Sequence, residues 1–222
     1  MNRSLARAAT AGAALALVPL GAGAAAAQEA PVPLGGGSGI VVDQAAQCTV
    51  TTIGYDAAGR LVGLTAGHCG DAGAGVVAEI DHDYGVVGRF VHSDPNLDYA
   101  VIQFDPAKVT PVDRVGNATI TGIGAPAQFP AVVCKKGRTS GETCGVAWGD
   151  VLNTTQETWN QLCVLEGDSG APVLVGSTLV GMVNAYLAFG CLGPQVGTTM
   201  TAIVADLNAR GDIGAGFHPL TR

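Results

Sequence analysis

Three residues of this 222-residue chain, His68, Asp98 and Ser169, are of the types that together make a serine hydroxyl nucleophilic. Ser169 lies in the sequence Gly-Asp-Ser-Gly, where small residues allow the backbone to turn tightly. His68 ends one apolar run, and Asp98 begins another. A histidine that takes the serine proton, held in place by a carboxylate, is an arrangement that cleaves amide bonds. The three residues therefore predict a catalytic triad with Ser169 as nucleophile, His68 as general base and Asp98 as the orienter of that base.

The small residues around the serine also predict donors for the oxyanion that forms during attack. A tight turn would aim the backbone N–H groups of Gly167 and Ser169 inward, as an oxyanion hole requires. Each triad residue also has a structural interpretation: Ser169 as a turn serine, His68 as a hydrogen-bonded core histidine, and Asp98 as a strand-end cap. Their occurrence together favours the catalytic interpretation.

A second class of serine hydrolase, the α/β esterase type, fits the sequence less well. That class needs Gly-x-Ser-x-Gly and the chain order Ser, Asp, His. Here Ala171 stands at the last glycine position, and the order is His, Asp, Ser.

The elements that must position these residues are predicted to be short strands. Runs of β-branched residues separated by Gly, Asp or Asn predict six strands in the first half, at 40–42, 48–53, 61–64, 75–80, 86–91 and 99–104. Six more are predicted in the second half, at 127–133, 143–152, 161–165, 172–175, 178–183 and 195–199. Strands of this length and spacing favour barrels or sandwiches. One helix is expected at 200–209, because Ile203, Val204 and Leu207 share a helical face and Gly211 follows.

Longer motifs around the triad resemble the chymotrypsin superfamily of serine peptidases. Thr-Ala-Gly-His-Cys at 65–69 and Gly-Asp-Ser-Gly at 167–170 carry the broad resemblance. The segment 134–145, Leu-Cys at 162–163 and Gly-Cys at 190–191 resemble the bacterial streptogrisin and α-lytic-protease-like branch, over roughly residues 39 to 209. The resemblance implies an all-β fold of two six-stranded antiparallel barrels with a C-terminal helix, and a secreted serine endopeptidase that acts through an acyl-enzyme.

The same resemblance implies a partner for Asp168, the carboxylate beside the nucleophile. A buried carboxylate is costly without a cation. The bacterial relatives use an internal arginine, and Arg138 stands in the matching stretch of this chain. An ion pair between Asp168 and Arg138 is therefore expected, the alternative being that Arg138 is a solvated loop residue.

By resemblance, the pocket for the substrate residue before the cut is lined by Val164, Glu166, Val183, Asn184, Tyr186 and Gly197. No acidic residue aligns with its base, which favours small or apolar side chains there. Tyr186 stands where the relatives have glycine, and Asn184 where they have serine. A bulky ring could close the pocket, so the alternative function is a protease-like binding protein with little or no activity.

Six cysteines in an exported chain indicate up to three disulfides, with fifteen possible pairings. Order along the chain suggests Cys48–Cys69, Cys134–Cys144 and Cys163–Cys191, although sequence alone does not prove it. Zinc binding is disfavoured because no Cys-x-x-Cys pair occurs.

Residues 1–27 are predicted to be a signal peptide, because Arg3 and Arg7 precede an uncharged stretch that ends in three alanines. An uncleaved membrane anchor is the alternative, disfavoured because the stretch is mostly Ala and Gly and contains Pro19. Residues 28–38 are predicted to be a flexible lead-in. The peptidase domain would span 39–222, with barrels at about 39–115 and 125–199.

The charge of the chain disfavours nucleic acid as a partner. Removal of the signal segment takes away two arginines and no acids, so the formal net charge changes from −7 to −9. Phosphate binding needs a basic surface instead. The expected partners are protein or peptide substrates, and a monomer is the default. No cofactor or metal is indicated; the one Asp-His-Asp sequence, around His82, is interpreted as a solvated acidic loop.

Overall fold

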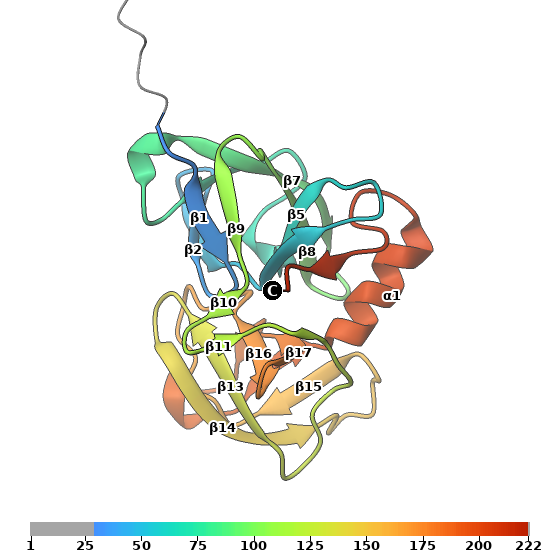
Figure 1. Cartoon of the computed structure of the whole chain (residues 1–222). Coiled ribbons are helices and arrows are strands. Elements are labelled where there is room, and N and C mark those ends of the chain that lie inside the picture. The colour runs from blue at the N-terminus through green and yellow to red at the C-terminus, as the bar shows by residue number, and fades with distance from the viewer. Residues whose placement is uncertain (1–28, 222) are drawn as a thin grey trace, which may run out of the picture.

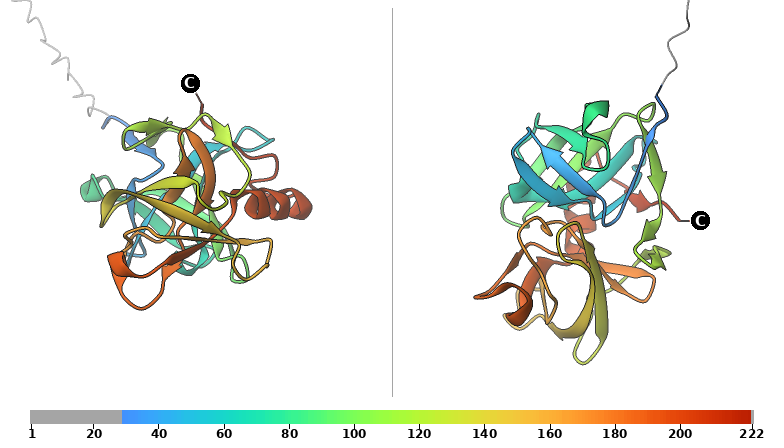
Figure 2. Two further views of the ribbon diagram at one scale, coloured as in Figure 1. Left: turned by 90° about the horizontal axis from the view of Figure 1, so that it is seen from below. Right: turned by 90° about the vertical axis from the view of Figure 1, so that its left-hand side faces the viewer.

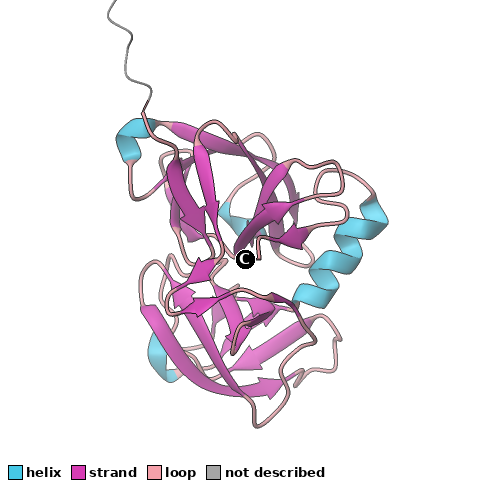
Figure 3. Ribbon diagram, viewed as in Figure 1, coloured by secondary structure: helices cyan, strands magenta, loops and turns pink. Residues whose placement is uncertain are grey.

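The computed structural model describes residues 29–221, so the predicted signal peptide at 1–27 lies outside the described residues. Strands are the main regular structure, arranged in two β-units of similar size with the helix α1 (Met200–Arg210) beside them (Figures 1 and 3). The right-hand view of Figure 2 shows the same division into two units. No helix among residues 29–221 has the length and apolar character needed to cross a membrane.

The N-terminal unit is an eight-stranded sheet in the order β20-β4-β5-β8-β7-β6-β2-β3. Its strands are β2 (Gly39–Val42), β3 (Ala46–Thr49), β4 (Thr52–Tyr55), β5 (Leu61–Ala66), β6 (Gly75–Ala78), β7 (Val86–Asp94), β8 (Tyr99–Phe104) and β20 (His218–Pro219). The strands β3 and β4 lie at or next to opposite ends of this order, yet only Val50 and Thr51 separate them in the chain. The chain therefore closes the sheet into a barrel.

The C-terminal unit is a second eight-stranded sheet, in the order β12-β17-β16-β13-β14-β15-β19-β18. Its strands are β12 (Gly122–Ile123), β13 (Val132–Gly137), β14 (Gly141–Gly149), β15 (Glu157–Asn160), β16 (Pro172–Val175), β17 (Thr178–Met182), β18 (Ala185–Tyr186) and β19 (Gln195–Thr198). Only Val183 and Asn184 connect β17 to β18, although these strands lie near opposite ends of the order. The chain therefore closes this second sheet into a barrel as well.

The two-barrel fold and the C-terminal helix are confirmed, but some strand positions were wrong. Each sheet has eight strands in place of six, because the run predicted at 48–53 is two strands and short strands such as β12 and β18 are added. The strand predicted at 127–133 begins at Val132, after Pro130. The strand predicted at 161–165 lies earlier, as β15, whose buried polar residues Thr158 and Asn160 hid it from an apolar pattern.

Residues 32–38 are part of the folded domain, and the predicted flexible lead-in was wrong for this segment. The strand β1 (Val32–Gly35) pairs in parallel with β9 (Val109–Val112). Val32 and Leu34 are buried in the core of the N-terminal barrel. Alternate residues of the segment thus face the core, which stabilises it despite the Pro and Gly nearby.

Three apolar clusters hold the two barrels and the helix together. One fills the N-terminal barrel, one fills the C-terminal barrel, and the third joins both to α1. In α1, Met200, Ile203 and Leu207 are buried against the third cluster, while Thr199 caps the first turn through the N–H of Ala202. The helix therefore braces the junction between the barrels.

The remaining elements are short. The connector between the barrels contains a hairpin of β10 (Arg114–Val115) and β11 (Ala118–Thr119). Three single-turn 3-10 helices are η1 (Gly67–Cys69), η2 (His82–Tyr84) and η3 (Gly190–Leu192). The Asp-His-Asp sequence around His82 forms η2, where Asp81 accepts the N–H of Tyr84.

Candidate active site

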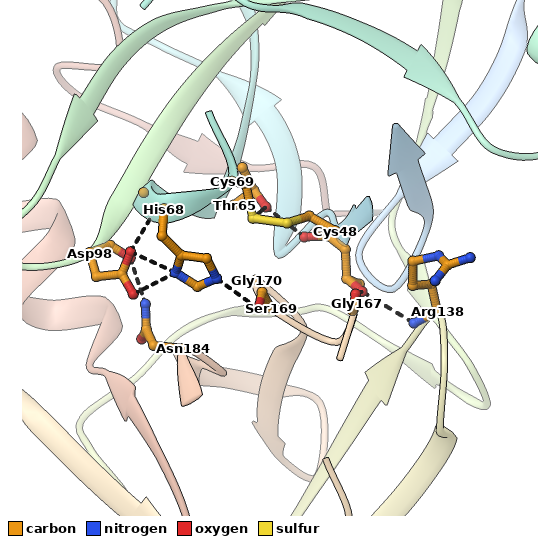
Figure 4. The surroundings of a disulfide bond; sticks show 12 residues. Cys48, Thr65, His68, Cys69, Asp98, Arg138, Gly167, Ser169, Gly170 and Asn184 are labelled. Atoms are coloured by element: carbon orange, nitrogen blue, oxygen red, sulfur yellow. Dashed lines mark hydrogen bonds and ion pairs between the residues drawn. A yellow bond between two sulfur atoms is a disulfide. The ribbon is translucent and has the colours of Figure 1, made fainter. Parts of the chain in front are cut away.

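His68, Asp98 and Ser169 meet where the two barrels face each other (Figure 4). The Nε2 atom of His68 lies 2.8 Å from the Ser169 hydroxyl oxygen. On the other side of the ring, Nδ1 lies 2.8 and 3.0 Å from the two carboxylate oxygens of Asp98. The three side chains thus form an unbroken line of hydrogen bonds, with the imidazole in the middle.

The N-terminal barrel fixes the histidine and the aspartate. His68 lies in η1 directly after β5, and its backbone N–H donates to the Asp98 carboxylate at 2.8 Å. The disulfide between Cys48 and Cys69 ties the adjacent residue to β3. Asp98 has a φ of 48°, a left-handed conformation that aspartate tolerates better than most residues. These constraints keep the carboxylate and the imidazole facing each other.

Hydrogen bonding shifts the pKa values of this pair in opposite directions. The hydrogen bond to Asp98 raises the pKa of His68 above its ordinary value, and partial burial opposes it. Burial would raise the pKa of Asp98, but the hydrogen bonds from His68 outweigh it and leave that pKa lowered. Asp98 is therefore ionised at neutral pH, as an orienting carboxylate must be.

We expect kcat/KM for peptide hydrolysis to rise with pH as His68 loses its proton, with a midpoint above the ordinary imidazole pKa of 6.5. Only the neutral ring can accept the Ser169 proton, and Asp98 keeps the ring protonated to a higher pH. The measurement is a pH profile of kcat/KM. A flat profile between about pH 5 and 8 would argue against His68 as the base.

Asn184 supports Asp98, where sequence reasoning had placed it in the substrate pocket. Its amide nitrogen donates to the Asp98 backbone carbonyl at 2.5 Å, and its amide oxygen accepts from the Thr198 N–H at 2.7 Å. The Thr198 hydroxyl donates to the carbonyl of Leu97, also at 2.5 Å. The C-terminal barrel therefore holds the loop that carries the aspartate (Figure 4).

Gly167 and Ser169, the residues predicted to form the oxyanion hole, lie on the turn that carries the nucleophile. Gly167 has a φ of 93°, the left-handed region that glycine adopts without strain. In the turn that follows, the N–H groups of Asp168 and Gly170 donate to the carbonyls of Leu165 and Val183. Within residues 29–221, no acceptor lies at the N–H of Gly167 or of Ser169. Both donors are thus free for a ligand beside the Ser169 hydroxyl.

Asp168 pairs with Lys135, so the expected ion pair between Asp168 and Arg138 was wrong. The Lys135 Nζ atom lies 3.3 Å from the Asp168 carboxylate, and both side chains are fully buried. Burial would raise the pKa of Asp168, but hydrogen bonds from the Ser140 hydroxyl and from backbone N–H groups, together with Lys135, leave it lowered. Lys135 faces inward on β13, whereas Arg138 follows the end of that strand.

Arg138 pairs with Glu79 of the N-terminal barrel. Its Nε donates to the Glu79 carboxylate at 2.8 Å, and Nη2 donates to the other carboxylate oxygen. This pairing raises the pKa of Arg138, and the hydrogen bond from Arg138 lowers the pKa of Glu79. The arginine therefore links the two barrels beside the Ser169 loop and is not a solvated loop residue.

The residues predicted to line one pocket do not all lie together. Val164 and Val183 are buried in the C-terminal barrel core. Gly197 and Asn184 line a small cavity of about 220 Å³ next to Asp98. Tyr186 lies on β18 with 38% of its surface exposed.

Glu166 lines a different and larger cavity, of about 460 Å³. This cavity also contacts His68, Ser169, Arg138 and the 45–48 segment of the N-terminal barrel. It opens beside the reacting groups, on the side that the Cys48–Cys69 disulfide borders. The position suits a segment of substrate next to the bond that Ser169 would attack.

The structure contains three disulfides, and they are the pairs that chain order suggested: Cys48–Cys69, Cys134–Cys144 and Cys163–Cys191. Cys134 and Cys144 face each other across the β13–β14 ladder. The bond from Cys163 to Cys191 ties η3 to the segment before the nucleophile. All three lie in or beside the elements that carry the site.

Sequence reasoning missed several residues at this site, among them Lys135, Thr49 and Thr139. Thr49 and Thr139 donate hydrogen bonds to backbone carbonyls of the loop that carries Ser169. Lys135 forms an ion pair with Asp168 of the same loop. Lys135 had a detectable signal, because the two-residue period of β13 places it on the buried face with Val133. The threonines had none, since their contacts join segments far apart in the chain.

The two barrels and the C-terminal helix define the fold of chymotrypsin-type serine proteases. A Nocardiopsis protease has this fold at 21% identity, over 86% of this chain and 100% of that one, with a TM-score of 0.68. Thermobifida fusca protease A matches at 22% identity, over 86% and 99%, with a TM-score of 0.66. A Cellulomonas bogoriensis chymotrypsin matches at 25% identity, over 81% and 96%, with a TM-score of 0.63.

Comparison with known sequences gives no match. No protein-family profile and no curated protein sequence matches the chain.

Proposed function

We propose that this protein is a serine endopeptidase with Ser169 as nucleophile, His68 as general base and Asp98 as the orienter of the base. The observation that carries the proposal is the line of contacts from Ser169 through His68 to Asp98, each with a distance of 2.8 Å. A turn serine, a core histidine and a capping aspartate have no reason to form such a line. The geometry therefore supports the catalytic interpretation over the structural one.

Acylation follows from this geometry. The Ser169 oxygen attacks the carbonyl carbon of the scissile bond while His68 Nε2 takes the hydroxyl proton. The carbonyl oxygen becomes an oxyanion and accepts hydrogen bonds from the N–H groups of Gly167 and Ser169. The imidazolium, stabilised by Asp98, then gives its proton to the leaving nitrogen. The C–N bond breaks, and an ester between substrate and Ser169 remains.

Deacylation repeats these steps with water as the nucleophile. His68 takes a proton from water, the hydroxide oxygen attacks the ester carbon, and the same two N–H groups hold the oxyanion. The proton returns from His68 to the Ser169 oxygen as the ester bond breaks. The products are a new carboxyl end and the free enzyme.

The proposed substrates are proteins or peptides with a small or apolar residue before the cut. The preference is proposed by resemblance, because no acidic residue aligns with the base of the pocket that would hold this residue. The leaving segment would occupy the cavity that Glu166 and Arg138 line. We also propose that the protein is secreted, which three disulfides support.

The competing function is a protease-like binding protein whose pocket Tyr186 closes. The partly exposed Tyr186 ring lies on the edge strand β18, beside Gln195 of β19. Covalent labelling separates the two functions, because a closed pocket would keep a reactive probe from Ser169.

A fluorophosphonate probe is expected to label the oxidised protein and to fail on Ser169→Ala. Only a serine activated by His68 reacts with such a probe at neutral pH. The matched control is Ser177→Ala, which removes a hydroxyl in the β16–β17 turn and should leave labelling unchanged. Absence of labelling in folded wild-type protein would sink the peptidase proposal. Profiling a peptide library then tests the pocket: a strong preference for Lys or Arg before the cut would contradict it.

A further inference from the structure

Every backbone carbonyl from Leu165 to Gly170 has a hydrogen-bond donor. The N–H groups of Asp168, Ala171 and Thr49 serve the carbonyls of Leu165, Asp168 and Ser169. Threonine hydroxyls serve the other three: Thr139 donates to Glu166, Thr49 to Gly167 and Thr51 to Gly170. The carbonyls of the nucleophile loop are thus all fixed, while the N–H groups of Gly167 and Ser169 stay free.

The direction of the Thr139 hydroxyl is set by Arg138. The Arg138 Nη1 atom donates to the Thr139 oxygen at 3.0 Å. A guanidinium can only donate, so the threonine oxygen is the acceptor there. Its single hydrogen is then left for the Glu166 carbonyl, at 2.7 Å. Glu79 in turn holds the guanidinium.

Thr49 repeats this arrangement from the opposite barrel. Its hydroxyl oxygen accepts the backbone N–H of Arg138 at 3.1 Å. Its hydrogen therefore points to the carbonyl of Gly167, at 2.9 Å in a buried position. Each of the two peptide groups that flank Gly167 accepts a hydrogen bond from a threonine hydroxyl. In both cases the threonine oxygen itself accepts a hydrogen bond from Arg138.

Holding these carbonyls controls the oxyanion donor. In a planar trans peptide the carbonyl and the N–H point in opposite directions, so fixing the Glu166 carbonyl also fixes the Gly167 N–H. Glycine at a φ of 93° would otherwise allow that peptide to rotate. Thr139 and Arg138 pack tightly on this residue: a Cβ at Gly167 would lie 2.5 Å from the Thr139 oxygen and 2.8 Å from Arg138 Nη1.

We propose that Thr139 and Thr49, each oriented by Arg138, are positioning residues that hold the two peptide groups flanking Gly167 and so keep the Gly167 N–H aimed at the oxyanion. The inference rests on the proposed peptidase function and assigns Arg138 a role other than neutralising Asp168. Each threonine acts through the peptide groups of Gly167, and its hydroxyl does not enter the chemical step. The lock acts in the transition state, where the Gly167 N–H meets the oxyanion, and so affects kcat more than KM.

The test compares Thr139→Val with Thr139→Ser in peptide hydrolysis. Valine keeps the shape but loses the hydroxyl, and kcat is expected to fall about ten- to hundred-fold, somewhat less than on losing a donor outright. KM should change less than about twofold, because ground-state contacts remain. Serine should restore kcat. Binding of a peptide aldehyde, whose adduct places an oxygen in the oxyanion position, should weaken in parallel with kcat.

The control is Thr110→Val, an exposed threonine on β9 far from the nucleophile loop in the chain. Thr49→Val provides a second variant of the lock, with the same expected pattern. Unchanged kcat in folded Thr139→Val and Thr49→Val would overturn the inference.

A readout without catalysis separates the inference from the peptidase proposal. The Gly167 amide signal in an NMR spectrum should shift or broaden in Thr139→Val and stay in place in Thr139→Ser. If wild type hydrolyses no peptide, the proposed function fails, and this signal still decides the lock. A Gly167 amide that is identical in all variants would overturn it.

Discussion

Replacing Asp98 by asparagine is expected to lower kcat about ten-thousand-fold with little change in fold. The asparagine amide can donate to His68 Nδ1, which puts the ring proton on Nε2. That nitrogen then cannot accept the Ser169 proton, even though it stays 2.8 Å away in the native geometry. The measurement is kcat on a peptide substrate, with circular dichroism to check folding.

The control for this variant is Asp105→Asn, an exposed aspartate after β8 that accepts the Ala107 N–H. It should leave kcat within about twofold, as surface changes usually do. Asp98→Asn should also lower the pKa of His68, because the hydrogen bond that raises it is weakened. A loss of less than tenfold for Asp98→Asn would contradict the role of Asp98 as orienter.

Replacing Lys135 by methionine is expected to lower the free energy of unfolding by about 3–5 kcal/mol, because it leaves a buried charge without its partner. Asp168 would keep its hydrogen bonds from Ser140 and from backbone N–H groups but lose the cation 3.3 Å away. Methionine has a similar length and fits the same space. The measurement is urea unfolding at neutral pH with the disulfides intact.

The matched control is Lys136→Met, the next residue on β13, which is only half-buried. Its loss should cost less than about 1 kcal/mol. If Arg138 were the partner of Asp168 after all, Arg138→Met would destabilise the protein more than Lys135→Met. Equal stability of Lys135→Met and wild type would likewise reject the ion pair with Asp168.

Glu166 and Arg138 both line the proposed leaving-segment cavity, and the charge of Arg138 is matched by Glu79. Sequence reasoning had assigned Glu166, by resemblance, to the pocket for the residue before the cut. In the structure the turn at Gly167 carries the neighbouring residue to the other side of the nucleophile. The cavity, not the motif, therefore decides which part of a substrate Glu166 can contact.

The sequence by itself determined the residue types of the triad, their chain order, the short-strand pattern and the C-terminal helix. These features are local: a helical face with Thr199 before it and Gly211 after it is complete within one segment. The turn around Ser169 is equally local. Even Lys135 could have been assigned to the buried side of its strand from the two-residue period.

Only the tertiary structure decided which side chains meet. Whether Asp168 pairs with Lys135 or Arg138 depends on where β13 ends, because Lys135 faces inward on the strand and Arg138 reaches across to Glu79. The parallel pairing of β1 with β9 and the threonine contacts to the Gly167 turn also depend on the tertiary structure. Barrel closure brings together segments far apart in the chain, and no local pattern of residues encodes that register.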